Sequence, residues 1–254
     1  MILTIDPGIL NMSMCIMSSE DKKDLETYNI HLWEVYNTLE SDDHLCKSIQ
    51  KNNKICNKKC SYKYEDDSDN LETFTCKLHF PKDKDIKDKK NIYKRKKIDE
   101  YLLQDIAINI LNKLQEVYDN NIELFNQLTH IYIELQPKCN PKSLFVSHII
   151  YGKFIELCKD TSIKFVRASQ KLKAYTGPPI ECKLKGKYAQ RKWLSIQYGQ
   201  WFLENKFTNE QRDKWLPTLT GKLDDRNDCL LMAINAITGI PKKQITNKKG
   251  KCIK

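Results

Sequence analysis

The order of its apolar segments limits the fold of this chain more than any other feature. Residues 2–6, 12–18 and 28–36 have the length and apolar character of β-strands, and few residues separate them. An antiparallel meander is the simplest arrangement of three strands joined in this way. The later segments are a helix over 94–118, a strand over 130–136, a helix over 143–159, a strand over 163–166, and helices over 187–205 and 224–237. Five strands and several helices in this order predict an α/β fold.

The segment 39–92 interrupts this order, because it has no apolar periodicity and is rich in Lys, Asp, Asn and Ser. It contains Cys56-Asn-Lys-Lys-Cys60 and, fifteen residues later, Cys76-Lys-Leu-His79. Two such pairs match the general plan of a structural zinc site, and a region this polar would depend on the metal for its folding energy. The predicted Zn²⁺ ligands of this zinc-knuckle insertion are Cys56, Cys60, Cys76 and His79. Cys46 and His44 are alternative donors, and a disordered insertion with incidental cysteines is the alternative interpretation.

Four carboxylates fall at particular places in the order of elements. Asp6 ends the first strand, Glu134 lies within the apolar fourth strand, and Asp225 and Asp228 share one face at the start of the last helix. Taken alone, Asp6 can be a turn residue, and Glu134 can lie on a solvent-exposed face. If the first and fourth strands are neighbours, however, the last helix can bring all four carboxylates into one cleft. Such a cluster binds two divalent ions, which is the arrangement used for phosphodiester hydrolysis.

The net charge of +10 and a pI near 9.0 favour a polyanionic partner such as nucleic acid, although a lysine-rich solvated surface gives the same numbers. Cations alternate with aromatic residues between 167 and 193, a pattern typical of phosphate contact and base stacking. The residues expected to contact nucleic acid are Lys171, Lys173, Lys187, Tyr188, Arg191 and Lys192. The alternative is a solvated helical face whose Tyr and Trp side chains lie in the core. A basic tail over 241–254 would add non-specific DNA affinity.

Several of these segments resemble the motifs of a known family, the RuvC-type Holliday junction resolvases, which have an RNase H-like fold. The resemblance lies in Asp6-Pro-Gly, Ile133-Glu134-Leu135-Gln136 and Asp225-Arg-Asn-Asp228. The resolvases of poxviruses and other large DNA viruses are similar in three segments: Glu134-Leu-Gln-Pro137, Tyr188-Ala-Gln-Arg191-Lys192 and Lys222-Leu-Asp-Asp225. The likeness covers roughly residues 1–36 and 94–240. It implies a mixed five-stranded sheet flanked by helices, in a discontinuous nuclease domain of residues 1–38 and 93–240.

The resemblance also implies an activity, that of a homodimeric endonuclease that nicks opposing strands of four-way DNA junctions. The implied ligands of two Mg²⁺ or Mn²⁺ ions are Asp6, Glu134, Asp225 and Asp228. Lys192, or its neighbour Arg191, would stabilise charge at the scissile phosphate, and Asp224 is the alternative to Asp225. Two other functions fit the same residues: an RNase H-like nuclease that cuts flaps or hybrids, and a non-catalytic zinc-dependent DNA-binding protein.

The ten cysteines bear on the expected compartment. Met1 leads directly into a strand-like segment, so we expect no secretory signal and a reducing intracellular compartment, where clustered cysteines bind metal. If the viral likeness holds, the site of viral DNA replication, in the host cytoplasm or a virus factory, is the expected location. We expect no membrane partner, because no apolar run approaches the ~18 residues of a membrane span.

Overall fold

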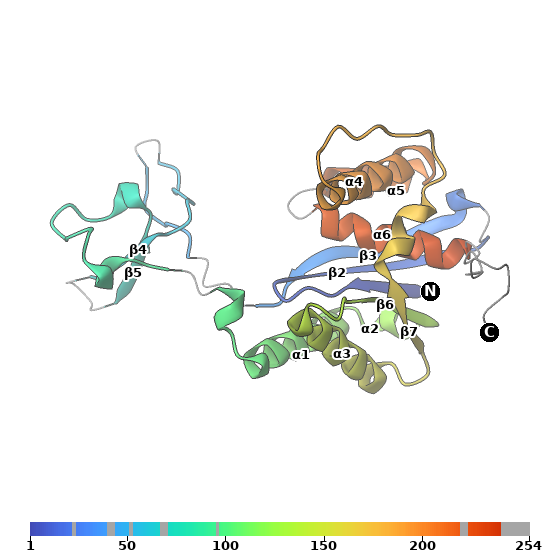
Figure 1. Cartoon of the computed structure of the whole chain (residues 1–254), viewed down its shortest axis with the longest axis horizontal. Coiled ribbons are helices and arrows are strands. Elements are labelled where there is room, and N and C mark those ends of the chain that lie inside the picture. The colour runs from blue at the N-terminus through green and yellow to red at the C-terminus, as the bar shows by residue number, and fades with distance from the viewer. Residues whose placement is uncertain are drawn as a thin grey trace. The chain divides into compact units, whose positions relative to one another are not determined.

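A computed structural model describes residues 1–21, 24–39, 44–50, 53–66, 71–94, 97–218 and 223–239. The chain divides into two compact units (Figure 1). The first unit comprises Met1–Thr38 and Ile106–Lys254, and the second comprises Leu39–Asp105. The predicted basic tail, 241–254, lies outside the described residues, as does Lys222 of one viral-type motif.

The first unit is built on a five-stranded sheet of order β3-β2-β1-β6-β7. The strands are β1 (Ile2–Asp6), β2 (Asn11–Ser19), β3 (Tyr28–Asn37), β6 (His130–Leu135) and β7 (Ser162–Arg167). β1, β2 and β3 form the predicted antiparallel meander, whereas β6 runs parallel to both β1 and β7. The predicted α/β fold with a mixed five-stranded sheet is therefore confirmed.

Helices cover both faces of this sheet (Figure 1). One side carries α1 (Leu103–Asn120) and α3 (Pro141–Leu157), with the short α2 (Ile122–Phe125) between them in the chain. The other side carries α4 (Lys187–Asn205), α5 (Asn209–Trp215) and α6 (Leu223–Thr238). Because both faces are covered, six consecutive residues of β2, Met12 to Met17, are buried, which explains why all of them except Ser13 are apolar. None of the described helices has the length and apolarity needed to span a bilayer.

Helix α6 packs on β1, β2 and β3 and forms the main core of the first unit. At the centre of this core, the Arg226 guanidinium lies 4.6 Å from the ring centroid of Trp33 and donates hydrogen bonds to Thr218. The Trp33 indole N–H donates in turn to the Arg226 carbonyl at 2.7 Å. These contacts fix the rotation of α6 on the sheet, and this rotation decides which of its side chains reach the carboxyl end of β1.

Two helices differ from the prediction. Helix α1 begins at Leu103 rather than near residue 94, and a 3₁₀ turn precedes it at Ile98–Glu100. Ile98 and Leu102 are 38% and 67% exposed, so the first two members of the predicted apolar stripe do not belong to a buried helix face. Helix α5 was not predicted, although Thr208 caps it by accepting a hydrogen bond from the Gln211 backbone N–H.

The second unit contains an antiparallel hairpin that the sequence prediction lacked. Its strands are β4 (Tyr62–Glu65) and β5 (Glu72–Thr75). Residues 44–50 and 53–60 pair in an irregular antiparallel manner through the bridges Leu45↔Lys59 and Ile49↔Ile55. The strands are only four residues long and pack around cysteines and aromatic rings rather than aliphatic side chains, which is why apolar periodicity did not reveal them.

Candidate active site

Two acidic residues meet because β1 and β6 are parallel neighbours. The register pairs Ile5 with Ile133, so Asp6 and Glu134, each one residue later, lie side by side at the carboxyl ends of these strands. Glu134 is 7% exposed, and the other buried residues of β6, Ile131 and Ile133, are apolar. The carboxyl ends of parallel strands are the usual position of binding sites in open α/β sheets.

The third carboxylate, Asp228, reaches this position because the start of α6 is hydrogen-bonded to the sheet. The Thr4 hydroxyl donates to the Cys229 carbonyl at 2.9 Å. The Asp6 backbone N–H donates to the Cys229 thiol at 3.1 Å, and the thiol donates to the Ser13 carbonyl at 3.1 Å. Cys229 is fully buried between β1 and β2, so its neighbour Asp228 is held next to Asp6.

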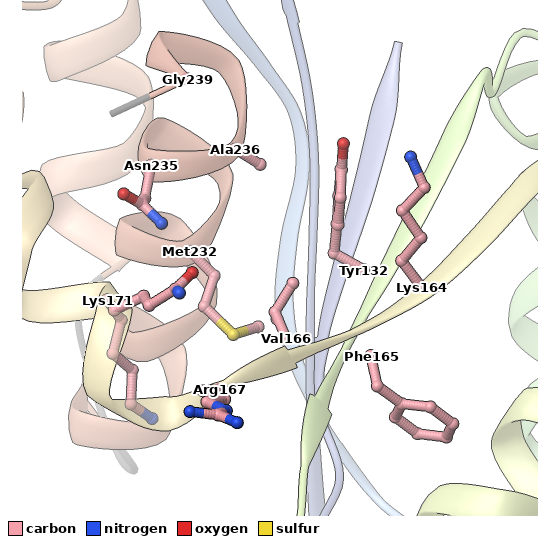
Figure 2. Close-up of a pocket in the computed structure, with 11 residues that line it drawn as sticks. Tyr132, Lys164, Phe165, Val166, Arg167, Lys171, Met232, Asn235, Ala236 and Gly239 are labelled. Carbon is pink, nitrogen blue, oxygen red and sulfur yellow. The ribbon is translucent and has the colours of Figure 1, made fainter. Parts of the chain in front are cut away.

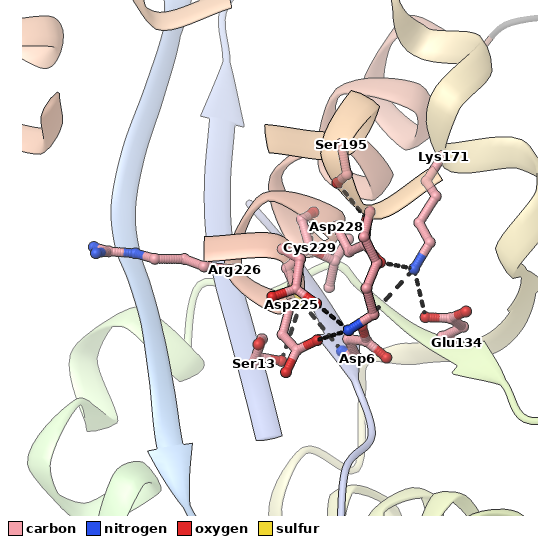
Figure 3. Close-up of polar contacts among 12 residues, drawn as sticks. Asp6, Ser13, Glu134, Lys171, Ser195, Asp225, Arg226, Asp228 and Cys229 are labelled. Carbon is pink, nitrogen blue, oxygen red and sulfur yellow. Dashed lines mark hydrogen bonds and ion pairs between the residues drawn. The ribbon is translucent and has the colours of Figure 1, made fainter. Parts of the chain in front are cut away.

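The Lys171 ammonium lies among the three carboxylates (Figure 3). Its Nζ atom is 3.0 Å from Glu134 Oε2 and 3.8 Å from Asp6 Oδ2, and it donates a short hydrogen bond to Asp228. The Ser195 hydroxyl of α4 donates to the other Asp228 oxygen. One cation thus faces three anions, which leaves an excess of two negative charges in a mostly buried group.

Burial and the neighbouring charges together shift the pKa values of this group. Burial, followed by the charge of Glu134, raises the pKa of Asp6 well above its usual value, and Lys171 only partly opposes the shift. Burial also raises the pKa of Asp228, despite its contacts with Lys171 and Ser195. Burial alone would lower the pKa of Lys171, but the three carboxylates raise it overall, so its amine stays protonated.

A cleft of about 510 Å³ opens over this group, and its rim is basic. The residues that line it are Asp6, Glu134, Gln136, Pro137, Ala168, Ser169, Lys171, Leu172, Tyr188, Arg191, Lys192, Asp225 and Asp228. Lys192 Nζ hydrogen-bonds to Asp224 and lies 3.9 Å from Asp225. Burial alone would lower the pKa of Lys192, but its hydrogen bonds with Asp224 and Tyr188 raise it overall. Among the described residues of the lining, Asp225 is present and Asp224 is not.

Helix α4 is held against α6 by a close approach at Gly199. A Cβ atom added at Gly199 would lie 1.7 Å from Asn227 Oδ1, so only glycine fits at this separation. Asn227 is fully buried and donates to the Leu223 carbonyl. Ser195 lies one helical turn before Gly199, and the approach therefore places its hydroxyl over Asp228.

The structure brings all four predicted carboxylates, together with Lys192, Tyr188 and Arg191, into one cleft. Lys171, predicted as a DNA contact, instead lies inside the carboxylate group. Lys173 and Lys187 are exposed and do not belong to the lining. The prediction did not include Ser195 or Cys229, and their spacing in the sequence carried no signal for their roles.

The donor set suits hard divalent cations. Carboxylate oxygens are the ligands that Mg²⁺ and Mn²⁺ prefer, and Asp6, Glu134, Asp225 and Asp228 all line the cleft. One ammonium faces three carboxylates in this group, and a divalent ion would supply the missing positive charge.

A second hollow of about 380 Å³ lies beside β7 (Figure 2). Tyr132, Lys164 and Arg167 line it from the sheet, and Met232 and Asn235 line it from α6. Lys171 lines both this hollow and the active-site cleft. The basic lining therefore extends from the cleft along the β7 edge of the sheet.

In the second unit, three of the four predicted zinc ligands come together: Cys56, Cys76 and His79. The fourth donor of this group is Cys46, and all four donor atoms lie within 4.8 Å of one another. Cys60, the remaining predicted ligand, packs beside the group but does not belong to it.

Comparisons with known proteins give limited matches. No family model matches the chain. An uncharacterized protein of Acanthamoeba polyphaga mimivirus is 26% identical over 233 residues, which cover 83% of this chain and 54% of that protein. The chain thus spans about half the length of this relative, whose description names no activity, and the likeness to poxvirus resolvases stays a prediction.

Two solved structures match this chain in a comparison that covers 94% of this chain and 96% of each of theirs. They are the RuvC structure of Thermus thermophilus, with a TM-score of 0.43 and 11% identity, and the same protein in complex with a Holliday junction substrate, with a TM-score of 0.42 and 10% identity.

Proposed function

We propose that this protein is a divalent-metal-dependent endonuclease that resolves four-way DNA junctions by paired phosphodiester hydrolysis. The observation that supports it most strongly is the convergence of Asp6, Glu134 and Asp228 on Lys171. These carboxylates come from β1, β6 and α6, and they are held together although desolvation and mutual repulsion oppose it. Perturbed carboxylates gathered in a cleft are typical of a functional site rather than of a stabilising ion pair.

The four cleft carboxylates would hold the metal ions. When bound, such ions activate a water molecule and stabilise the leaving oxygen of a phosphodiester. Ser195 orients one of the ligands, because its hydroxyl occupies one Asp228 oxygen and leaves the other toward Lys171. The Lys171 ammonium attracts all three carboxylates and offsets part of their mutual repulsion, so the group is already assembled before DNA binds.

The basic rim would bind the phosphate backbone. Lys192 lies 5.2 Å from the Tyr188 ring centroid, and both residues line the cleft with Arg191. A protonated Lys192 beside Asp225 would stabilise negative charge that develops at the scissile phosphate, and Arg191 is the alternative for this role. The net charge of +10 supports a nucleic-acid substrate.

The choice of a four-way junction rests on the sequence motifs that resemble RuvC-type resolvases. Two nicks placed symmetrically in opposing strands require two active sites, so we also propose a homodimer. The cleft itself would equally serve a nuclease for flaps or RNA–DNA hybrids, and the test has to separate these substrates.

The deciding experiment compares cleavage of a labelled immobile four-way junction, a flap, a linear duplex and an RNA–DNA hybrid, with Mg²⁺ or Mn²⁺ and with EDTA. We expect metal-dependent paired nicks in the junction and little cleavage of the other substrates. Preference for the flap or hybrid, or unpaired nicks, would contradict junction resolution.

Two variants test the active site. Glu134→Gln and Asp228→Asn should each reduce cleavage by at least about 100-fold and still bind the junction, because they change charge without removing the basic rim. Asp160→Asn makes the same chemical change at an exposed position and should cleave as the wild type does. Wild-type cleavage by both active-site variants would exclude the proposed centre.

A further inference from the structure

We infer that the second unit binds one zinc ion in a tetrahedral site made by Cys46, Cys56, Cys76 and His79, with Cys60 outside the ligand set. This site lies wholly within Leu39–Asp105 and is independent of the proposed nuclease centre.

Three of the six distances between the donor atoms match the edges of a tetrahedron around zinc. Zn–S bonds of about 2.3 Å and Zn–N bonds of about 2.0–2.1 Å give edges of about 3.8 Å between sulfurs and about 3.6 Å between sulfur and nitrogen. The Cys56 and Cys76 sulfurs are 3.8 Å apart. His79 Nδ1 is 3.4 Å from both the Cys76 and the Cys46 sulfur. Because a disulfide needs sulfurs about 2.05 Å apart, the cysteines are poised for a shared ion rather than for a bond to each other.

The backbone presents these donors from two sides. Cys76 and His79 bracket one 3₁₀ turn, closed by a 3.1 Å hydrogen bond from the His79 N–H to the Cys76 carbonyl, so their side chains lie on the same side. Opposite this turn, the Cys46 N–H donates to the Lys58 carbonyl, and the Asn57 N–H donates to the Cys46 carbonyl. Asn57, which directly follows Cys56, has φ of 52°, a left-handed conformation that Asn tolerates.

The composition of this small core shows why it requires an ion. Cys46, Cys56 and Cys76 are buried, whereas Ile49 and Leu78 are 71% and 73% exposed. Aliphatic burial therefore contributes little here, and the apolar packing comes mainly from aromatic rings. Four zinc bonds would supply the folding energy that so polar a unit otherwise lacks.

Cys46 is the better fourth ligand than Cys60 on geometric grounds. Its thiol is fully buried and lies within hydrogen-bond distance of His79 Nδ1, whereas the Cys60 thiol does not belong to the group of mutually close donors. The other alternative donor, His44, is stacked on Phe74 with ring centroids 3.4 Å apart, and it packs rather than ligates.

Metal analysis of the full chain tests this assignment. The wild type should hold about one zinc per chain, and so should Cys60→Ser and Cys139→Ser, the latter altering an exposed cysteine of the first unit. Cys46→Ser should hold at least about fivefold less zinc. Absence of zinc from the wild type, or loss in Cys60→Ser with retention in Cys46→Ser, would overturn the inference.

A second variant covers the case in which Cys46→Ser does not fold. Cys46→His retains a ligand, and with Co²⁺ in place of zinc it should lose about one third of the sulfur-to-cobalt charge-transfer absorption, because two thiolates replace three. The same change at Cys60 should leave this absorption unaltered. An unaltered spectrum for Cys46→His would exclude Cys46 from the site.

Discussion

Replacing Asp6 by asparagine should stabilise the metal-free protein and abolish its activity at the same time. Asp6 is mostly buried, and its raised pKa means that the folded state holds the ionised carboxylate less favourably than the unfolded chain does. Removing this charge lowers the excess on the carboxylate group from two negative charges to one, and Lys171 keeps Glu134 and Asp228 as partners.

The distances around Lys171 give the size of the effect. At an effective dielectric constant of about 20, the 3.8 Å pair of Asp6 and Lys171 attracts by about 4 kcal/mol. Glu134 lies 3.0 Å from the same ammonium, so its oxygen is at most about 7 Å from that of Asp6 and repels it by at least about 2 kcal/mol. Asp228 adds a similar repulsion. Attraction and repulsion nearly cancel, and the desolvation cost of Asp6, several kcal/mol per buried ion, is left without compensation.

An asparagine avoids only part of that desolvation cost, because its buried amide still needs hydrogen-bond partners. We therefore expect Asp6→Asn to gain about 1–3 kcal/mol, which corresponds to about 2–10 °C in Tm. Thermal unfolding in EDTA near neutral pH measures the shift, with the exposed Asp160→Asn as a control that should change stability by less than about 0.5 kcal/mol. Added Mn²⁺ should raise the Tm of the wild type more than that of Asp6→Asn.

The pH dependence provides a second readout of the same reasoning. A carboxyl whose pKa is raised on folding binds more protons in the folded state, so stability falls as the pH rises through the window between the unfolded and folded pKa values. Metal-free wild type should thus gain stability as the pH is lowered from neutral through the folded pKa of Asp6, and Asp6→Asn should gain less. A lower Tm for Asp6→Asn in EDTA would refute this reasoning, since Asp6 would then be a stabilising partner of Lys171.

Three further substitutions test other contacts. Gly199→Ala places a Cβ 1.7 Å from Asn227 Oδ1 and should lower the unfolding free energy, measured by thermal unfolding, by about 1–3 kcal/mol. The control Gly152→Ala has open space around its helical position and should raise the unfolding free energy by up to about 1 kcal/mol. Equal effects of the two substitutions would contradict the close approach of α4 and α6. Lys171→Met removes the cation that competes with metal for the carboxylates, so calorimetry should show Mn²⁺ binding at least about tenfold tighter, and unchanged affinity would show that the ammonium does not compete. Arg226→Met removes the hydrogen bonds to Thr218 and should lower the unfolding free energy by about 2–3 kcal/mol, measured by urea denaturation. A loss below about 0.5 kcal/mol would show that these hydrogen bonds are dispensable.

Periodicity predicted the elements of the first unit closely, because each buries a continuous or one-sided apolar surface. The segments 2–6 and 187–205 are β1 and α4 to the residue. The start of α1 was placed nine residues early because Ile98 and Leu102 extend its apolar stripe in sequence but are exposed in the fold. Periodicity reports the pattern along the chain and cannot show where packing against the rest of the molecule stops.

The carboxylates of the candidate site were predictable because each stands out locally, as a charge at a strand end, within an apolar strand or at a helix start. The positions of Lys171 and Ser195 were not, since each reaches Asp228 across more than thirty residues of sequence. The choice between Cys46 and Cys60 as the fourth zinc ligand was likewise not predictable from the sequence. Spacing favours Cys60, and only the antiparallel pairing of residues 44–50 with 53–60, which places Cys46 opposite Asn57, reverses that preference.

The arrangement of the site depends on its buried scaffold more than on its ion pairs. Helix α6 is positioned by the Thr4 and Cys229 hydrogen bonds and by the core around Trp33, none of which involves a side-chain carboxylate of the cleft. Substituting Asp6 or Glu134 should therefore change the charge of the cleft without moving the elements that carry it. For that reason, loss of cleavage with retained folding and junction binding would identify the carboxylates as chemical groups, whereas joint loss of folding and cleavage would show that they hold the fold together.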